Sequence, residues 1–140
     1  MDKKTLIEKL QEILEFEYTD IFIYNNEANL FKEKIKGGEK LAEIYKDFAL
    51  EELTHADNIS KQISSLGRKP LWEYKNIFVS NSIRESLKLH LEREIKAYKA
   101  YTELIKQIED REFKILLKGI RDNEKQHIEQ ISKFLKKIVK

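Results

Sequence analysis

Apolar residues recur at intervals of three and four positions through four stretches of the chain. This spacing places side chains on one face of an α-helix and leaves the opposite face polar. Glycine, proline and short polar residues separate the stretches, at Gly37-Gly38, at Gly67 with Pro70, at Ser80-Asn81-Ser82 and around Asp110. The pattern therefore predicts four long helices, at about residues 3–35, 39–66, 82–109 and 111–138.

The connections between these helices differ in length. The first and third are short, which predicts that the helices on either side of each form an antiparallel hairpin. The second, over residues 67–81, is long enough to run from one end of a bundle to the other, with Trp72 and Phe78 packed against its side. The predicted fold is an all-α four-helix bundle of two antiparallel hairpins joined by one long crossover, in a single domain over residues 1–140.

The amino-acid composition excludes several fold classes and kinds of site. Four glycines and one proline in 140 residues are too few for the turns of an all-β or α/β chain. The chain has no cysteine, which excludes a disulfide framework, a thiolate zinc site and an iron–sulfur cluster. The absence of cysteine also suits a reducing compartment, so we expect a cytoplasmic protein.

Charge and hydropathy indicate which classes of partner the chain is expected to lack. The net charge is +2, from 27 Lys and Arg against 25 Asp and Glu, with the two signs interspersed along the chain. A nucleic-acid-binding protein concentrates positive charge on one face, so no nucleic-acid partner is expected. No apolar run reaches the roughly 18 residues of a membrane span, and no signal peptide opens the chain, so no membrane partner is expected either.

Ionisable residues interrupt the apolar face near the middle of every predicted helix. A single glutamate does so in the first and third helices, and a Glu-x-x-His pair does so in the second and fourth. Residues three apart share a helix face, so each pair presents a carboxylate and an imidazole in one direction. The interrupting residues are Glu17, Glu52 with His55, Glu94, and Glu124 with His127.

Four buried carboxylates facing one another would be costly without compensating positive charge. Two divalent cations would supply +4, and carboxylate oxygens with two neutral imidazoles suit ferrous or manganous ions. These six residues are therefore predicted to be metal ligands.

An internal repeat supports this prediction. Glu17 and Tyr24 recur as Glu94 and Tyr101, both shifted by 77 residues. The first Glu-x-x-His pair recurs as the second, shifted by 72 residues. Two similar hairpins related in this way would bring two similar ligand sets face to face.

Five further residues are expected to assist the ligands. Glu51 and Asn123 each precede a ligand glutamate and are expected to accept a hydrogen bond from the histidine of the opposite motif. Tyr24 and Tyr101, two turns after the single glutamates, are expected to donate to those carboxylates and to deliver protons. His90, one turn before Glu94, is expected to be partly exposed and bonded to a neighbour, the alternative being a third nitrogen ligand.

With these motifs the chain resembles the ferritin-like superfamily, and within it the four-helix domain of rubrerythrins, from about residue 5 to residue 137. The motifs are Glu17-x-x-Asp20-x-x-x-Tyr24, Glu52-x-x-His55, Glu94-x-x-Ala97-x-x-x-Tyr101 and Glu124-x-x-His127. The resemblance implies that Glu52 and Glu124 bridge two iron ions, that Glu17 and Glu94 are terminal ligands, and that each ion binds one histidine.

The same resemblance implies a non-haem di-iron oxidoreductase of the peroxidase or ferroxidase type, which reduces hydrogen peroxide or dioxygen. Rubrerythrins usually carry a rubredoxin-like domain with four cysteines, and this chain has none. We therefore expect electrons from an external, rubredoxin-like donor protein. A homodimer is the default expectation for a long helical bundle with such a site.

Three other functions remain open on the sequence. The same ligands suit a manganese catalase-like enzyme, because both metals accept oxygen and nitrogen donors. A ferritin-like iron-binding and storage protein would carry many irons per chain. A metal-free helical interaction module would use the buried glutamates and histidines as a salt-bridge network, and its stability would not respond to chelators.

Overall fold

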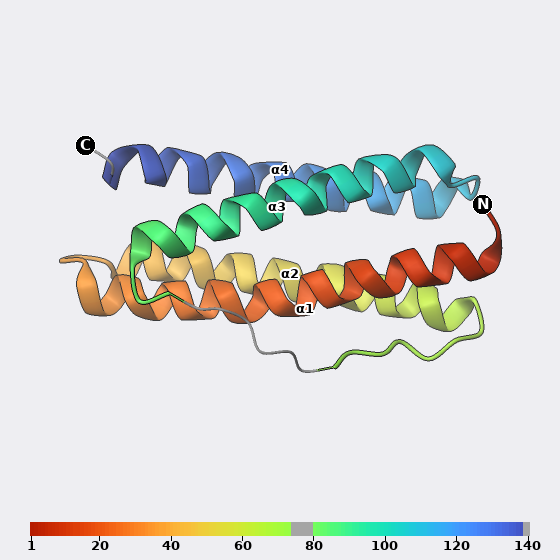
Figure 1. The fold of residues 1–140 in the computed structure, drawn as a ribbon, viewed down its shortest axis with the longest axis horizontal. Helices are drawn as coiled ribbons and strands as arrows, with labels where there is room; N and C mark the ends of the chain where they lie inside the picture. Colours follow the sequence, from red (N-terminus) through yellow and green to blue (C-terminus); the bar gives the residue numbers. More distant parts are fainter. Residues whose placement is uncertain (74–79, 139–140) are drawn as a thin grey trace. The chain divides into compact units, whose positions relative to one another are not determined.

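Four helices form where the apolar pattern predicts them. The computed structural model describes residues 1–73 and 80–138, and its helices are α1 (Lys3–Lys34), α2 (Glu39–Ser65), α3 (Ile83–Gln107) and α4 (Arg111–Ile138) (Figure 1). The described residues include no strand. The predicted all-α fold, with two helical hairpins joined by one long connection, is confirmed, and every predicted helix end lies within two residues of the observed one.

The chain divides into two compact units, Met1–Ile83 and Arg84–Lys140. The first contains α1, α2 and the long connection, and the second contains all but the first residue of α3 together with α4. Each unit is a helical hairpin. That the two hairpins make one domain stays a prediction.

The first hairpin is defined at its start and at its turn by local hydrogen bonds. The Thr5 backbone N–H donates to Asp2 Oδ1 at 2.7 Å, which satisfies one of the free donors at the start of α1. This bond also holds the pKa of the Asp2 carboxyl below its usual value. At the turn, Gly37 has a φ of +75°, a conformation that glycine adopts at little cost, and the Gly38 N–H donates to the Ile35 carbonyl at 3.0 Å.

An aromatic cluster fills the end of the first hairpin that lies near this turn. Tyr45 of α2 packs edge-on against Phe31 of α1, with ring centroids 4.7 Å apart. Tyr24 makes similar contacts with Tyr45 at 5.6 Å and with Phe48 at 5.5 Å. Edge-to-face pairs of this kind stabilise the fold by about 0.5–1.5 kcal/mol, in addition to the stabilisation from the apolar area that they bury. The cluster therefore fixes the register of α1 against α2 close to the glutamate positions.

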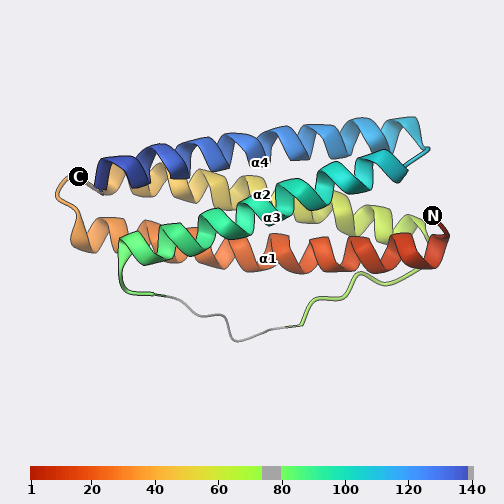
Figure 2. The ribbon, with the colours of Figure 1, turned by 45° about the horizontal axis from the view of Figure 1, so that its top comes forward.

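The long connection is tied to both ends of α1. The Gln11 side-chain amide donates to the Leu71 carbonyl at 2.7 Å and accepts from the Leu71 N–H at 3.1 Å, as a neighbouring β-strand would. Lys34, the last residue of α1, donates to the Asn81 carbonyl. The described parts of the connection thus begin near the start of α1 and end near its last turn (Figure 2).

Trp72 packs against the side of α1, as predicted. Its ring is stacked on Phe22, with centroids 5.8 Å apart, and lies 5.3 Å from Tyr18. Phe78, the other residue predicted to hold the connection in place, lies outside the described residues.

The second hairpin turns sharply between α3 and α4. Asp110 ends the turn, because its Oδ1 accepts from the Phe113 N–H at 3.2 Å and its carbonyl accepts from the Lys114 N–H at 2.9 Å. This is the N-cap arrangement that aspartate favours. The buried side chains of α3 and α4 include large aliphatic and aromatic ones, namely Leu87, Leu104, Ile105, Phe113, Leu117, Ile120 and Ile131.

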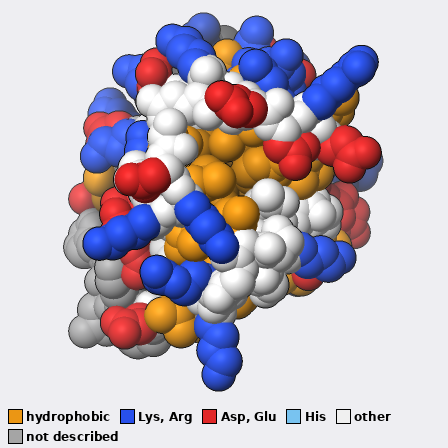
Figure 3. Space-filling model, turned by 90° about the vertical axis from the view of Figure 1, so that its right-hand side faces the viewer, with side chains coloured by type: hydrophobic (Ala, Val, Ile, Leu, Met, Phe, Trp, Pro, Cys, Tyr) orange, Lys and Arg blue, Asp and Glu red, His pale blue; other side chains and the backbone are white. Residues whose placement is uncertain are grey.

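The described surface is strongly charged. On the face drawn in Figure 3, Lys and Arg side chains lie among Asp and Glu side chains. Within the described residues, each helix is too polar over any stretch of sufficient length to cross a bilayer.

Gly119 offers a stabilising substitution. It lies on the exposed side of α4, and a Cβ at this position would meet nothing within 4 Å outside its own helix. Glycine inside a helix costs about 1 kcal/mol relative to alanine. We expect Gly119→Ala to raise the free energy of unfolding by about that amount in urea denaturation. The matched control is Gly37→Ala, which should lower it because alanine is strained at a φ of +75°. A destabilised Gly119→Ala variant would contradict the geometry of α4.

Candidate metal centre

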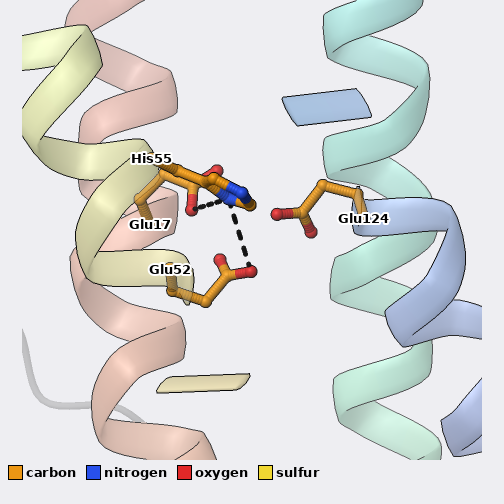
Figure 4. A group of neighbouring side chains, drawn as sticks. All are labelled: Glu17, Glu52, His55 and Glu124. Carbon is orange, nitrogen blue, oxygen red and sulfur yellow. Dashed lines mark hydrogen bonds and ion pairs between the residues drawn. The ribbon is translucent and has the colours of Figure 1, made fainter. Parts of the chain in front are cut away.

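The first hairpin brings three of the predicted ligands together. Glu52 and His55 lie one turn apart on the inward face of α2, and Glu17 lies on the inward face of α1 (Figure 4). His55 Nδ1 is 3.3 Å from Glu17 Oε2 and 3.7 Å from Glu52 Oε1. One donor atom of each residue lies within 4.8 Å of the others. Figure 4 also draws Glu124, which belongs to α4.

These three side chains are almost wholly removed from water. Glu17 and Glu52 are 1% exposed and His55 is 5% exposed. Even with the imidazole protonated, the trio carries a net charge of −1 when both carboxylates are ionised. Such a buried charge costs several kcal/mol unless a counter-charge lies close to it. The cluster therefore suits a cation.

The second hairpin repeats this arrangement. Glu94 lies on α3, and Glu124 and His127 lie one turn apart on α4. His127 Nδ1 is 3.6 Å from Glu94 Oε2, and one donor atom of each of the three lies within 4.8 Å of the others. All three side chains are fully buried. The internal sequence repeat thus corresponds to a repeated local geometry, in which the histidine of each Glu-x-x-His pair faces the single glutamate of the neighbouring helix.

His90 differs from its sequence-based prediction. We expected it to be partly exposed, but it is buried, with 1% of its surface exposed. Its Nε2 lies 3.4 Å from Glu94 Oε1, so the expectation that it contacts a neighbour agrees with the structure. Its place one turn before Glu94 on the same helix explains both observations, because residues four apart share a face. In the repeat the equivalent position of the first hairpin is Ile13, so only the second cluster has this extra imidazole.

The other predicted residues lie near their expected helix positions. Tyr24 and Tyr101 are fully buried, two turns after Glu17 and Glu94. Glu51 and Asn123 are half-buried, and Asn123 Nδ2 donates to Gln126 Oε1 at 3.4 Å. The expected hydrogen bonds from these two residues to the histidines, and from the tyrosines to the single glutamates, stay predictions.

Two buried acids on α1 were not assigned a role from the sequence. Asp20 and Glu27 are each 1% exposed. Asp20 follows Glu17 by one turn, and Glu27 follows Tyr24 by three residues, so all four lie on one helix face. Their spacing, which places them on the same face as Glu17, is visible in the sequence. However, several acids on one helix face also look like a solvent-exposed face, and the sequence does not show which helices cover it.

The chemistry of the donor atoms defines what the clusters can hold. Both consist of carboxylate oxygens and imidazole nitrogens, with no thiolate or thioether. This set suits first-row divalent ions such as Fe²⁺ and Mn²⁺. Buried carboxylate and histidine groups of this kind are able to bind metal ions. The residues present therefore fit the ferrous or manganous ions that the sequence predicts.

A family comparison agrees with this geometry. The family model of the ferritin-like domain matches residues 7–140, which is nearly the whole chain and includes all six predicted ligands. The chain belongs to the ferritin-like domain family. No curated protein matches it. Members of the ferritin-like family are four-helix bundles that hold metals between carboxylate- and histidine-bearing helices, and the family includes oxidoreductases.

Proposed function

We propose that this ferritin-like chain is a rubrerythrin-like, non-haem di-iron oxidoreductase that reduces hydrogen peroxide or dioxygen. The observation that carries the proposal is the repeated buried cluster, with two carboxylates and one imidazole in each hairpin. In this proposal the two hairpins form one domain, and their clusters together hold two iron ions. The match to one family model over both hairpins supports a single domain.

The ligand roles follow the family pattern. In this proposal Glu17 and Glu94 would be terminal ligands and Glu52 and Glu124 would be bridging ligands, with one histidine for each ion. The short distances from His55 to Glu17 and from His127 to Glu94 support this pairing of each histidine with one terminal carboxylate.

Ferrous ions at this centre would supply the two electrons that convert one hydrogen peroxide and two protons into two water molecules. The chain's own groups have three tasks in that reaction. The carboxylates would hold the ions while their charge changes, because carboxylate oxygens suit hard cations. His90 orients Glu94 through its contact with Oε1. The buried hydroxyls of Tyr24 and Tyr101, two turns after the terminal carboxylates on the same helices, would deliver protons.

The reducing electrons must come from outside the chain. The sequence has no cysteine, so it contains neither a rubredoxin-type iron site nor a redox-active disulfide. A separate, rubredoxin-like electron-donor protein is therefore part of the proposal. A cytoplasmic location also belongs to the proposal, because a cysteine-free chain gains nothing from an oxidising compartment.

Anaerobic titration with peroxide tests this function. The ferrous-loaded protein is titrated with hydrogen peroxide while ferric absorbance and dioxygen are recorded. We expect one peroxide to oxidise two ferrous ions per chain without release of dioxygen, because each peroxide takes two electrons. The exposed-site variant Glu129→Ala should give the same stoichiometry.

Other outcomes would contradict the proposal. Dioxygen release without net iron oxidation would indicate catalase-like disproportionation. Continued uptake of many irons per chain would indicate storage. Full occupancy by manganese in protein purified from its own host would contradict the assignment of iron.

A further inference from the structure

Positive charge is unevenly divided between the two hairpins. Residues 84–140 contain 15 Lys and Arg against 10 Asp and Glu, whereas residues 1–83 contain 12 against 15. The small net charge of the whole chain therefore combines a basic second unit with an acidic first unit. Because charged side chains are mostly exposed, the second hairpin has a basic surface.

Four of these basic residues form a stripe along α4. Lys114, Lys118, Arg121 and Lys125 follow one another at spacings of four, three and four residues, so they lie on one side of the helix. The exposed members are Lys118 and Lys125, and the other two are half-buried. We refer to these four residues as the α4 basic stripe.

Two acids lie beside the α4 basic stripe. Asp122 Oδ1 is 3.1 Å from Arg121 Nη2, a partly exposed contact of little energetic weight. Glu129 follows Lys125 by one turn and ends the basic run. Four basic side chains against these two acids leave the stripe with a positive net charge.

The exposed face of α3 differs, because acids and bases alternate along it. Its central residues are Glu92, Lys96, Lys99, Glu103 and Lys106. Lys106 also pairs with Glu103 at 3.1 Å. The excess positive charge of the second hairpin is therefore concentrated on α4.

An exposed apolar side chain lies next to the α4 basic stripe. Ile115 is 60% exposed, although isoleucine is among the residues most often buried. It precedes Lys118 by three residues and Gly119 by four, so all three share a helix face. A Cβ on Gly119 would meet nothing within 4 Å outside its own helix, so the backbone beside Ile115 is accessible. Apolar contacts bordered by charged groups are typical of protein–protein interfaces.

The α4 basic stripe also lies close to the second cluster of predicted ligands. Lys125 directly follows Glu124 along the chain, and Glu124 and His127 are fully buried on the inner side of α4. A helix with its side chains is about 10–12 Å thick. A redox group docked on the stripe would therefore be separated from the cluster by about one helix. Because electron transfer slows steeply with distance, this position suits an electron donor.

We propose that the α4 basic stripe, together with Ile115, is the docking surface for the external electron donor, and that this donor is a protein with an acidic surface around its redox group. The inference rests on the proposed oxidoreductase function, which requires electrons from outside the chain. Charge complementarity identifies the partner as acidic, since opposite charges steer two proteins together and fix their orientation. Electron-transfer complexes bury little surface and are transient, so a short stripe of this kind is large enough.

Binding of a redox-inert donor tests the surface separately from catalysis. The probe is an acidic rubredoxin in which zinc replaces iron, titrated into the metal-loaded chain at low ionic strength in a calorimeter. Lys118→Glu/Lys125→Glu should raise the dissociation constant about tenfold or more. The matched control is Lys96→Glu/Lys99→Glu, which makes the same charge change at exposed positions of α3 and should alter the constant by less than about twofold.

The apolar contact has a different salt dependence. Ile115→Gln should raise the dissociation constant about fivefold at both low and high ionic strength, because salt does not screen an apolar contact. Its control is Leu89→Gln on α3, where the leucine is 39% exposed, and this variant should bind as wild type does. Circular dichroism checks that every variant keeps its helix content.

Reduction kinetics connect the surface to the proposed reaction. Reduced iron rubredoxin should reduce the ferric-loaded Lys118→Glu/Lys125→Glu variant at least about tenfold more slowly than wild type. Dithionite, which needs no docking surface, should reduce both to the same extent. If dithionite-reduced wild type then fails to reduce peroxide, the oxidoreductase function itself is wrong. If it reduces peroxide but does not bind the rubredoxin, only the docking surface is wrong.

Three further results would overturn the docking surface. One is normal binding by Lys118→Glu/Lys125→Glu, which would place the contact elsewhere. Another is an equal loss in the α3 control, which would show an effect of net charge alone. The third is tighter binding of the α4 basic stripe to a duplex DNA oligonucleotide, or to vesicles that contain phosphatidylserine, than to the acidic rubredoxin.

Discussion

Replacing Glu52 or Glu124 by alanine is expected to abolish binding of ferrous and manganous ions while the metal-free protein remains folded. Each carboxylate belongs to a buried cluster in which an imidazole and a second carboxylate lie within 4.8 Å. If both glutamates bridge the ions, as we propose, removal of either takes a ligand from both. The metal-free variants should be as stable as wild type or more stable, because repulsion between buried carboxylates falls.

Calorimetric titration under anaerobic conditions measures the effect, and urea denaturation of the metal-free proteins measures stability. Exposed glutamates on the same helices provide the controls: Glu43→Ala on α2 and Glu129→Ala on α4 should bind metal as wild type does. Glu52→Gln keeps the side-chain volume, so it separates loss of charge from loss of packing. Normal binding of two ions by both alanine variants would show that these residues are not ligands.

Bound metal is expected to raise the stability of the wild-type chain by several kcal/mol. A ligand that binds only the folded state adds about 2.7 kcal/mol at a concentration 100 times its dissociation constant, and two sites would add about twice that. Anaerobic thermal unfolding with saturating Fe²⁺ or Mn²⁺ should therefore give a melting temperature well above that of the chelator-treated protein.

The control for this measurement is Glu52→Gln, whose melting temperature should not respond to metal or chelator. This comparison distinguishes a metal centre from a metal-free salt-bridge network. A network of buried glutamates and histidines would give the same melting temperature in chelator and in metal. Equal wild-type values in the two conditions would thus contradict the proposed centre.

Much of the fold could be predicted because the sequence repeats one simple signal. Helical periodicity and the scarcity of glycine and proline predicted the four helices, and Asp110 marked the start of the last one at its N-cap. The two hydrogen bonds between the Gln11 side chain and the Leu71 backbone could not be predicted in this way. These hydrogen bonds join a side chain to backbone 60 residues away. Nothing in the sequence around Gln11 or Leu71 distinguishes them from other glutamines and leucines.

The candidate site was predictable where chemistry and spacing coincide. Two Glu-x-x-His pairs on inward faces are unusual enough to indicate ligands, and the structure groups each pair with a single glutamate. Burial was harder to predict. His90 lies at the edge of its apolar face, so the sequence did not show that it is fully enclosed. Asp20 and Glu27 were missed for the same reason, because the width of a buried face depends on the helices that cover it.

We propose that acids and imidazoles lie inside this protein because metal ions neutralise them there. Crystals grown anaerobically with manganous salt, with anomalous scattering recorded near the manganese edge, test it most directly. We expect two anomalous peaks per chain, one beside His55 and one beside His127, with Glu52 and Glu124 close to both. Crystals in which these side chains point into water, with no anomalous peak among them, would contradict it.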